Sequence, residues 1–510
     1  MERGQEVGQP GQAVQAALAA ARRVILFRGV VERSPLLRAL VALLEVCAAE
    51  GPPPTPAPAE RHLWERAAAL AQAMLAGPLA RSDAAAGQSR DPGPAVAPWH
   101  AAVVQGLLAD ENPLSEAAAR SRDADPRSLQ GLPPALVAAA SHDLRCLQGL
   151  ASLSPEALEE AVRLREPSWP PGVLTGRWLC EVGSAGPWPE GATMVLRQLA
   201  SLPNWDEALP DLVAYWRVAG SGPWGQYVAF RWDGLEGGAG GGLHPVRTPD
   251  PTRLEDLVGY EAAREAVVEN TERLVSGRPA HHLLLYGPRG TGKSATVRAL
   301  AHAFGARGLR LVELPLARVG ELPRLLDLLR DRPQSFIILL DDLSLDPHDP
   351  ATRELKVVME GALEAWPENV RLYATSNRRH VVRESRTGSG FRQEDETNEQ
   401  ISLADRFGMT VHFEAADQEL YLRIVEGLAR KAGVQVLDGE PVAGGEIHAP
   451  RANGPVPGSP CARHSGPPWV VDRKTLAEEA LRWALWNNDR SPRTAAQFVR
   501  DWVGRAGSPT

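Results

Sequence analysis

The stretch His281–Leu300, HHLLLYGPRGTGKSATVRAL, decides the fold of this 510-residue chain. Residues 282–286 form an apolar run with the length of a buried parallel strand, and a glycine-rich turn leads from it into a helical pattern. Residues 287–294, GPRGTGKS, match the pattern G-x-x-x-x-G-K-[ST] in full. A strand, a glycine-rich loop and a helix in this order predict an α/β fold that binds a polyphosphate.

Each residue of this loop is a candidate binding residue: Gly287, Pro288, Arg289, Gly290, Thr291, Gly292, Lys293 and Ser294. Glycines let the backbone curl so that successive N–H groups point inward, where they and the helix N-terminus hold phosphate. We expect Lys293 to reach the outer phosphates and Ser294 to offer its hydroxyl to Mg²⁺. Only four of the 55 basic residues are lysine, which suggests that a compact charge is needed at position 293.

The composition bounds the class of protein. The chain is 44% hydrophobic and 23% charged, and its formal net charge of -8 argues against sequence-independent nucleic-acid binding over the whole surface. Its four cysteines form no C-x-x-C pair, so we expect reduced thiols in a cytoplasmic protein and neither a zinc site nor a disulfide framework. No signal peptide or membrane-spanning stretch is visible, which predicts no membrane partner.

The pattern along the chain predicts four segments. Residues 1–165 are mostly helical, and an interaction or scaffolding module is favoured for them. Residues 166–250 are tryptophan-rich, with short strands near Tyr227–Trp232 and a glycine-rich hinge at 234–242. Residues 251–415 alternate between strands and helices. Residues 416–510 form a helical lid with a Gly/Pro-rich insertion at 438–468, which we expect to be a disordered surface loop.

The alternating segment predicts a five-stranded parallel sheet between helices, because strand–helix alternation implies right-handed crossovers. After the strand at 282–286, we expect strands at 309–314, 335–342, 370–377 and 410–413. The intervening helices are expected at 260–275, 293–304, 321–329 and 351–365.

Two acidic residues follow the apolar strand 336–340. A carboxylate at the carboxyl end of a strand beside the phosphate-loop strand can hold Mg²⁺, usually through water, and we assign that role to Asp341. Asp342 is placed to orient or deprotonate an attacking water. The alternative for both residues is a polar turn after a strand.

Three further residues are candidates for catalysis. Asn377 ends the fourth strand and could position the lytic water, although such a residue is more often a turn former. Arg406 precedes the fifth strand and could reach a neighbouring subunit's nucleotide, or form a surface salt bridge. Arg493 lies one turn inside the last helix and could contact the γ-phosphate from a lid.

Together these residues resemble the AAA-type (AAA+) ATPases, and in detail an uncharacterised bacterial group of predicted ATP-binding proteins, domain of unknown function 815. The resemblance covers about residues 215–503. Its most specific signature is Tyr373–His380, YATSNRRH, and the other matching segments are 254–260, 270–272, 287–294, 341–344, 402–408 and 490–498. It implies a P-loop AAA+ core with a helical lid, ATP and Mg²⁺ as ligands, Asn377 as sensor, Arg406 as arginine finger and Arg493 as lid arginine.

The chain departs from most AAA-type enzymes at Asp342, where they have glutamate. This puts efficient hydrolysis in doubt, since the water or the strand would have to shift by about a methylene's length. Asp346 is a less favoured substitute base. The insertion at 438–468 is a second departure, which an exposed position would tolerate.

We therefore expect an ATP hydrolase that converts ATP and water to ADP and phosphate, assembles into a homo-oligomer with shared sites, and remodels an unidentified protein partner. The alternative is a slowly hydrolysing ATP-dependent switch or adaptor. A nucleic-acid loader is less favoured, because the arginines between 378 and 392 are balanced by acidic residues between 384 and 396.

Overall fold

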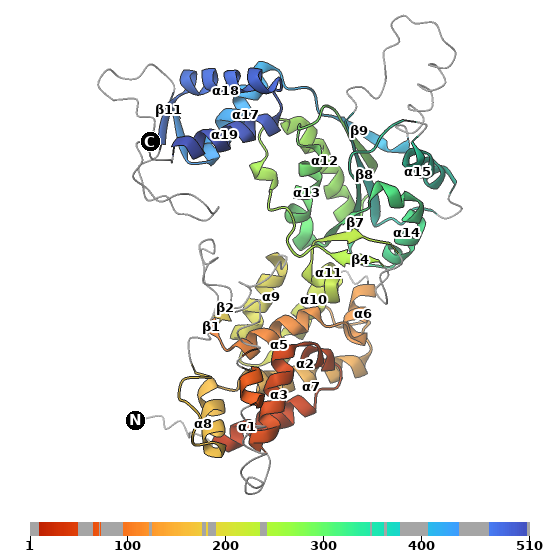
Figure 1. Cartoon of the computed structure of the whole chain (residues 1–510). Coiled ribbons are helices and arrows are strands. Elements are labelled where there is room, and N and C mark those ends of the chain that lie inside the picture. The colour runs from red at the N-terminus through yellow and green to blue at the C-terminus, as the bar shows by residue number, and fades with distance from the viewer. Residues whose placement is uncertain are drawn as a thin grey trace, which may run out of the picture. The chain divides into compact units, whose positions relative to one another are not determined.

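Figure 1 shows the computed structural model of the chain. It describes residues 10–48, 65–70, 72, 95–121, 125–175, 180–181, 190–234, 242–346, 349–361, 365–377, 406–437 and 469–506. Most of the expected hinge, the arginines between 378 and 392, and the insertion at 438–468 lie outside these residues.

The chain divides into two compact units. The first runs to Val228 and includes residues 306–308 and 332–334, and the second holds the rest. The four segments expected from the sequence stay a prediction. None of the described helices is long and apolar enough to cross a membrane.

The first unit is built almost entirely from helices in its described part. They are α1 (Pro10–Arg22), α2 (Arg28–Arg33), α3 (Pro35–Ala48), α5 (Pro98–Ala109), α6 (Pro113–Arg120), α7 (Pro134–Ala151), α8 (Pro155–Arg165), α9 (Glu190–Ser201), α10 (Leu209–Ala219) and α11 (Gly222–Gln226), with a 3₁₀ turn η2 (Trp205–Ala208). Two short strands, β1 (Ala95–Val96) and β2 (Cys180–Glu181), pair antiparallel.

Proline begins many of these helices, because its missing N–H falls where the first helical turn has no backbone acceptor. The helices bury one apolar core, and Trp99, Trp205 and Trp216 lie in it. Part of the tryptophan-rich stretch therefore packs with the N-terminal helices.

The second unit contains the expected parallel sheet. Its strands are β3 (Ala229–Trp232), β4 (Leu243–Pro245), β5 (His282–Tyr286), β6 (Leu309–Glu313), β7 (Ser335–Leu340), β8 (Val370–Ser376) and β9 (Gly408–His412). Their order is β4-β3-β6-β7-β8-β5-β9, and the five strands from β6 to β9 in this order are all parallel. The predicted fold class, a P-loop α/β fold of the AAA+ type, is confirmed.

Two strands extend this sheet beyond the five that the sequence predicts. β3 pairs parallel with β6, and β4 pairs antiparallel with β3. β3 alternates buried residues with the exposed Arg231, as expected of a strand close to an edge. The aromatic run near Trp232 thus belongs to the phosphate-loop sheet.

Helices flank the sheet. They are α12 (Glu261–Val275), α13 (Lys293–Phe304), α14 (Leu322–Arg330) and α15 (Pro350–Gly361), with 3₁₀ turns η3 (Leu254–Asp256), η4 (Gly305–Arg307) and η5 (Leu316–Glu321). In Figure 1, α12 and α13 lie on one side of the sheet and α14 and α15 on the other. α13 leads from β5 to β6 in one direction across the sheet, whereas α14 and α15 lead back from β6 through β7 to β8 in the other. Right-handed crossovers therefore place α13 on one face and α14 and α15 on the opposite face.

The C-terminal part of this unit is helical, as expected. It comprises α17 (Gln418–Lys431), α18 (Arg473–Asn487) and α19 (Pro492–Ala506), with the parallel pair β10 (Val434–Leu437) and β11 (Trp469–Asp472). Asp417 and Asp472 cap α17 and α18 with their side chains. We call residues 417–437 and 469–506 the lid, and its core includes Tyr421, Ile424 and Phe498.

Candidate functional site

The phosphate loop leaves the sheet between two neighbouring strands. β5 pairs with β8 on one side and with β9 on the other, so Tyr286 lies opposite both Ser376 and His412. The loop then turns at Gly287, which has φ +144°, and a Cβ there would lie 2.0 Å from the carbonyl oxygen of Phe413. Only glycine fits this turn. The loop is therefore held against the carboxyl ends of β8 and β9.

Lys293 is folded into the loop, with only 5% of its surface exposed. Its Nζ donates to the carbonyl oxygens of Gly287 at 2.9 Å and Pro288 at 2.7 Å, and to Oδ1 of Asn377 at 3.3 Å. Burial lowers the pKa of Lys293 to about 8, although the charges of Asp342 and Asp341 act in the opposite direction. The structure thus places a tightly held ammonium group at the mouth of the loop.

Asp341 follows β7 and lies beside Ser294. Its Oδ1 accepts hydrogen bonds from Ser294 Oγ at 2.5 Å and from Thr375 Oγ1 at 2.6 Å. Its Oδ2 accepts from Arg298 Nη2 at 2.8 Å. Three elements, α13, β7 and β8, therefore converge on one carboxylate.

This donor set fits a hard cation such as Mg²⁺. A hydroxyl and a carboxylate are both oxygen ligands, and Mg²⁺ in nucleotide sites commonly takes one or two carboxylates and completes its shell with phosphates and water. No group of three or more His, Cys, Asp or Glu residues in the described part of the chain could hold a metal ion. A metal held by Ser294 and Asp341 would take its further oxygens from phosphates and water.

Asp342 adopts a left-handed backbone conformation, with φ +59°. Aspartate tolerates this region better than most residues. The backbone N–H of Asp342 donates to Thr375 Oγ1 at 2.9 Å, and its Oδ1 accepts from the Asn377 amide. Because the same Asn377 side chain also contacts Lys293, it links the two charged groups across the site.

Arg493 reaches the phosphate loop from the lid. Its backbone N–H donates to the carbonyl of Gly290 at 3.3 Å, while its side chain is exposed. The turn before it is fixed by Asp489, whose carboxylate accepts from Ser491 Oγ at 2.6 Å and from Thr494 Oγ1. Burial opposes the charge on Asp489, but these hydrogen bonds hold its pKa below the usual value.

The structure does not bring Arg406 to this cluster. It is exposed and lies two residues before Gly408, which pairs with His282 at the amino end of β5. The phosphate loop leaves the carboxyl end of that strand, roughly 13 Å away at the usual rise per residue. Arg406 therefore lies toward the opposite end of the sheet from the phosphate loop of its own chain.

Sequence reasoning missed two residues of this cluster, Thr375 and Arg298. Thr375 lies in the last pleat of β8, two residues before Asn377, which directly follows the strand. Arg298 lies four residues after Ser294, one turn further along the same face of α13. These two spacings in the sequence could have indicated that Thr375 and Arg298 lie near the site.

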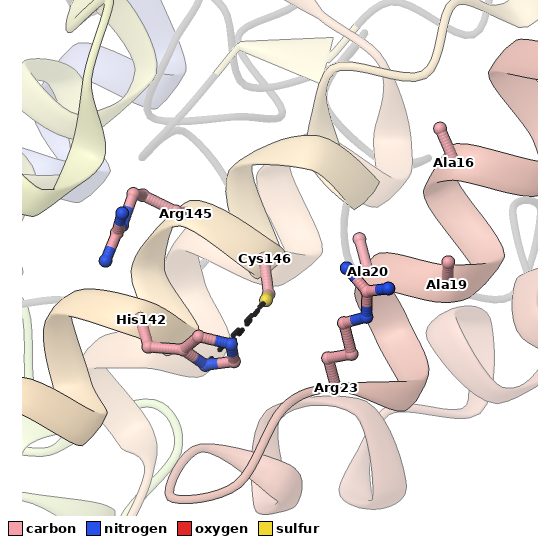
Figure 2. Close-up of a pocket in the computed structure, with 7 residues that line it drawn as sticks. All are labelled: Ala16, Ala19, Ala20, Arg23, His142, Arg145 and Cys146. Carbon is pink, nitrogen blue, oxygen red and sulfur yellow. Dashed lines mark hydrogen bonds between the residues drawn. The ribbon is translucent and has the colours of Figure 1, made fainter.

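A second candidate lies in the first unit. Figure 2 shows a pocket of about 330 Å³ where α1 and α7 face each other, lined by Ala16, Ala19, Ala20, Arg23, His142, Arg145 and Cys146. Cys146 Sγ lies 3.9 Å from Nδ1 and 3.8 Å from Nε2 of His142, so the thiol is nearly equidistant from the two ring nitrogens. Burial and the Asp143 charge raise the pKa of Cys146, which disfavours a reactive thiolate. The geometry does not support nucleophilic chemistry there.

Comparison with known proteins finds one family model and several relatives that resemble part of this chain. A family model described as "Protein of unknown function (DUF815)" matches residues 225–443 and 463–506. A proteasome-activating nucleotidase of Methanoculleus marisnigri is 30% identical over 166 residues, which cover 28% of this chain and 40% of that protein. Replication factor C subunit 3 of Blastobotrys adeninivorans is 27% identical over 139 residues, covering 26% and 39% respectively. The chain thus spans about two fifths of the length of these curated relatives.

Among solved structures, two RuvB mutants of Thermotoga maritima match with TM-scores of 0.30 and 0.29. They are 13% and 15% identical to this chain, and each alignment covers 49% of it. The alignments cover 64% and 63% of the RuvB chains.

Proposed function

The chain belongs to the family described as protein of unknown function DUF815, which matches just over half of its residues, and on that premise we propose that it is an AAA+ ATP hydrolase. The observation that carries the proposal is the hydrogen-bonded cluster around the phosphate loop. Lys293 and Ser294 begin α13, Asp341 and Asp342 follow β7, and Asn377 follows β8. The Thr375 hydroxyl joins their hydrogen bonds into one network. The curated relatives that the chain resembles over about a quarter of its length, a nucleotidase and a replication factor subunit, are consistent with it.

The loop would bind the polyphosphate of ATP. Backbone N–H groups of residues 287–294 and the N-terminus of α13 would receive the phosphates. Lys293 would exchange the carbonyls of Gly287 and Pro288 for phosphate oxygens, which restores full hydrogen bonding to its ammonium group. The loop would contact only the phosphates and could not select the base. That the base is adenine is therefore a separate part of the proposal.

Ser294 and Asp341 would hold Mg²⁺. When bound, this ion supplies positive charge to the phosphate oxygens and helps to hold them in line for transfer. The Ser294 hydroxyl would turn its proton away from Asp341 and present a lone pair. Thr375 would keep the Asp341 carboxylate in place during this change.

Asp342 would accept the proton of the attacking water. Its backbone is fixed by Thr375 and its carboxylate by Asn377, so its orientation is set before substrate binds. Asn377 would also position the water. We propose that Arg493 senses the γ-phosphate from the lid, and that Arg406 completes the site of a neighbouring subunit in a cytoplasmic homo-oligomer.

The coupled function would be remodelling of a protein partner, whose identity these residues do not specify. A slowly hydrolysing switch or adaptor is the second candidate. Asp342 favours this candidate. The Asp342 side chain is a methylene shorter than glutamate, and its Oδ1 already accepts a hydrogen bond from Asn377, so proton transfer from water would be slow. A nucleic-acid loader remains less favoured.

Steady-state ATP hydrolysis against protein concentration tests the first proposal. We expect wild-type turnover to rise more steeply than linearly, and Lys293→Ala and Arg406→Ala to abolish it. Arg406→Ala should still bind ATP. The exposed Lys474 in α18 supplies a matched control, since Lys474→Ala removes the same charge away from the site.

Asp342→Asn separates the two candidates. Rapid turnover that is lost in this variant supports the hydrolase. ATP binding that depends on Lys293, with hardly any turnover at any concentration, supports the switch. Linear activity down to concentrations where light scattering shows a monomer would overturn the shared site.

A further inference from the structure

The carboxylate assigned to the metal is already paired with a cation of the chain itself. Arg298 Nη2 lies 2.8 Å from Asp341 Oδ2, and the side chains are 37% and 29% exposed. The other oxygen, Oδ1, accepts from two hydroxyls, those of Ser294 and Thr375. Both oxygens of Asp341 are therefore engaged by protein groups.

A divalent cation at Ser294 and Asp341 would lie within a few ångströms of this guanidinium. Arginine keeps its charge at any accessible pH, so the repulsion cannot be relieved by loss of a proton. A free Mg²⁺ ion would have to displace Arg298 or bear that repulsion. When the ion is bound to a polyphosphate, the negative charge of the phosphates exceeds that of the ion and offsets its repulsion by the guanidinium.

A second carboxylate lies within electrostatic reach of Arg298. Hydrogen bonds from the side chain and backbone of Thr252 lower the pKa of Asp250, and the Arg298 charge contributes in the same direction. Asp250 precedes η3, and its own backbone carbonyl oxygen contacts Nε2 of His302 in α13. A guanidinium that leaves Asp341 thus has another acidic partner nearby.

We propose that Arg298 is a counter-charge that keeps free divalent cations off Asp341, so that metal enters the site only together with nucleotide phosphates. This inference rests on the proposed function of the site. It assigns Arg298 a role in metal selection and not in the chemical step. It also explains why a basic residue lies on the face of α13 that carries Ser294.

The test measures metal binding without nucleotide. Full-length protein is titrated with Mn²⁺, and the free ion is followed by electron paramagnetic resonance. Arg298→Gln should bind Mn²⁺ at least about tenfold more tightly than wild type, because a full positive charge a few ångströms from the ion is removed. Arg298→Lys keeps the charge and should stay close to wild type.

Two controls locate the effect. Arg324 is an exposed arginine of α14 in the same unit, so Arg324→Gln removes an equal charge elsewhere and should leave Mn²⁺ binding unchanged. Adding Asp341→Asn to Arg298→Gln should abolish the gain. Circular dichroism melting of each variant verifies that it is folded, and if Arg298→Gln unfolds, Arg298→Met takes its place with the same expected gain.

Equal Mn²⁺ affinity in wild type and Arg298→Gln overturns the inference, as does a gain that survives Asp341→Asn. No nucleotide is present in these titrations. Failure to bind or hydrolyse ATP would therefore defeat the proposed function, while the metal titrations would still decide the role of Arg298.

Discussion

The hydroxyl of Thr375 donates a hydrogen bond to Oδ1 of Asp341 at 2.6 Å. The two residues lie at the carboxyl ends of neighbouring strands, β8 and β7. The same hydroxyl accepts the backbone N–H of Asp342 at 2.9 Å. One side chain, 2% exposed, therefore orients both acidic residues, and it fixes the proposed metal ligand relative to the proposed base.

Replacing Thr375 by valine keeps the side-chain shape and removes the hydroxyl. The Asp342 N–H then loses its acceptor, and the Asp341 carboxylate loses one of its hydrogen-bond donors. We expect ATP turnover to fall roughly 10- to 100-fold, the usual effect of removing a group that orients a metal ligand. Steady-state assays at saturating Mg²⁺ measure this.

Thr375→Ser is the matched control for that substitution. Serine keeps the hydroxyl and should retain most of the turnover. Nucleotide binding in the presence of a chelator should be the same in all three proteins, because the Thr375 hydroxyl bonds the two aspartates and the loop holds phosphate through its own N–H groups and Lys293. Turnover in Thr375→Val equal to wild type would show that the hydroxyl does not position the acids.

Gly290 and Gly292 both have positive φ, at +80° and +92°, but only Gly290 touches the lid. A Cβ on Gly290 would lie 2.6 Å from Ser491 Oγ, whereas a Cβ on Gly292 meets nothing within 4 Å. Alanine at either position carries the left-handed strain of about 1–2 kcal/mol. Gly290→Ala should therefore lower the thermal midpoint of the nucleotide-free protein more than Gly292→Ala. Equal midpoints would mean that the lid contact at Gly290 contributes nothing.

The sequence predicted the parts of the site that local patterns specify. The strand at 282–286, the loop at 287–294 and Asp341 each follow from spacing within a few residues, and the structure has them in these places. The partner of β3 could not be read in this way. An aromatic run predicts a strand, but its pairing with Leu311, some eighty residues later, depends on which edge of the sheet is open.

The same limit applied to the side chains that the sequence did not single out. The Arg298 contact with Asp341 joins two positions 43 residues apart, and the contact of Gly290 with Arg493 joins the core to the lid. Helical spacing put Arg298 on the right face of α13. It could not say which strand end that face would meet.

Asp110 in the first unit should make stability depend on pH. Burial raises its pKa to about 6, against the hydrogen bond from Asn112 and the charge of Arg33, and the usual value is 3.8. Between these values the folded state binds more protons than the unfolded state, so stability falls as the pH rises from 4 to 6. The Asp110 charge then destabilises the unit at all higher pH.

Asp110→Asn should therefore raise the free energy of unfolding at pH 7 by up to roughly 3 kcal/mol, and with it the thermal midpoint. At pH 4 both quantities should change little. Thermal melts followed by tryptophan fluorescence at both pH values measure this, since Trp99 and Trp216 lie in the same core. Glu160→Gln, an exposed change of equal charge in α8, should show no such pH dependence. A midpoint gain that is the same at pH 4 and pH 7 would contradict the assignment.

Arg406 lies toward the amino end of β5 and Lys293 follows its carboxyl end, so a shared site must combine these residues from different subunits. Lys293→Ala and Arg406→Ala should each be inactive alone. Mixed in equal amounts and allowed to exchange subunits, they should regain up to about a quarter of wild-type turnover, because an Arg406→Ala subunit can pair its intact loop with the intact arginine of a Lys293→Ala neighbour. The recovery should disappear when both substitutions are placed in every subunit. If mixed oligomers form, as native mass spectrometry would show, but turnover stays at the level of the single variants, Arg406 does not act across the subunit boundary.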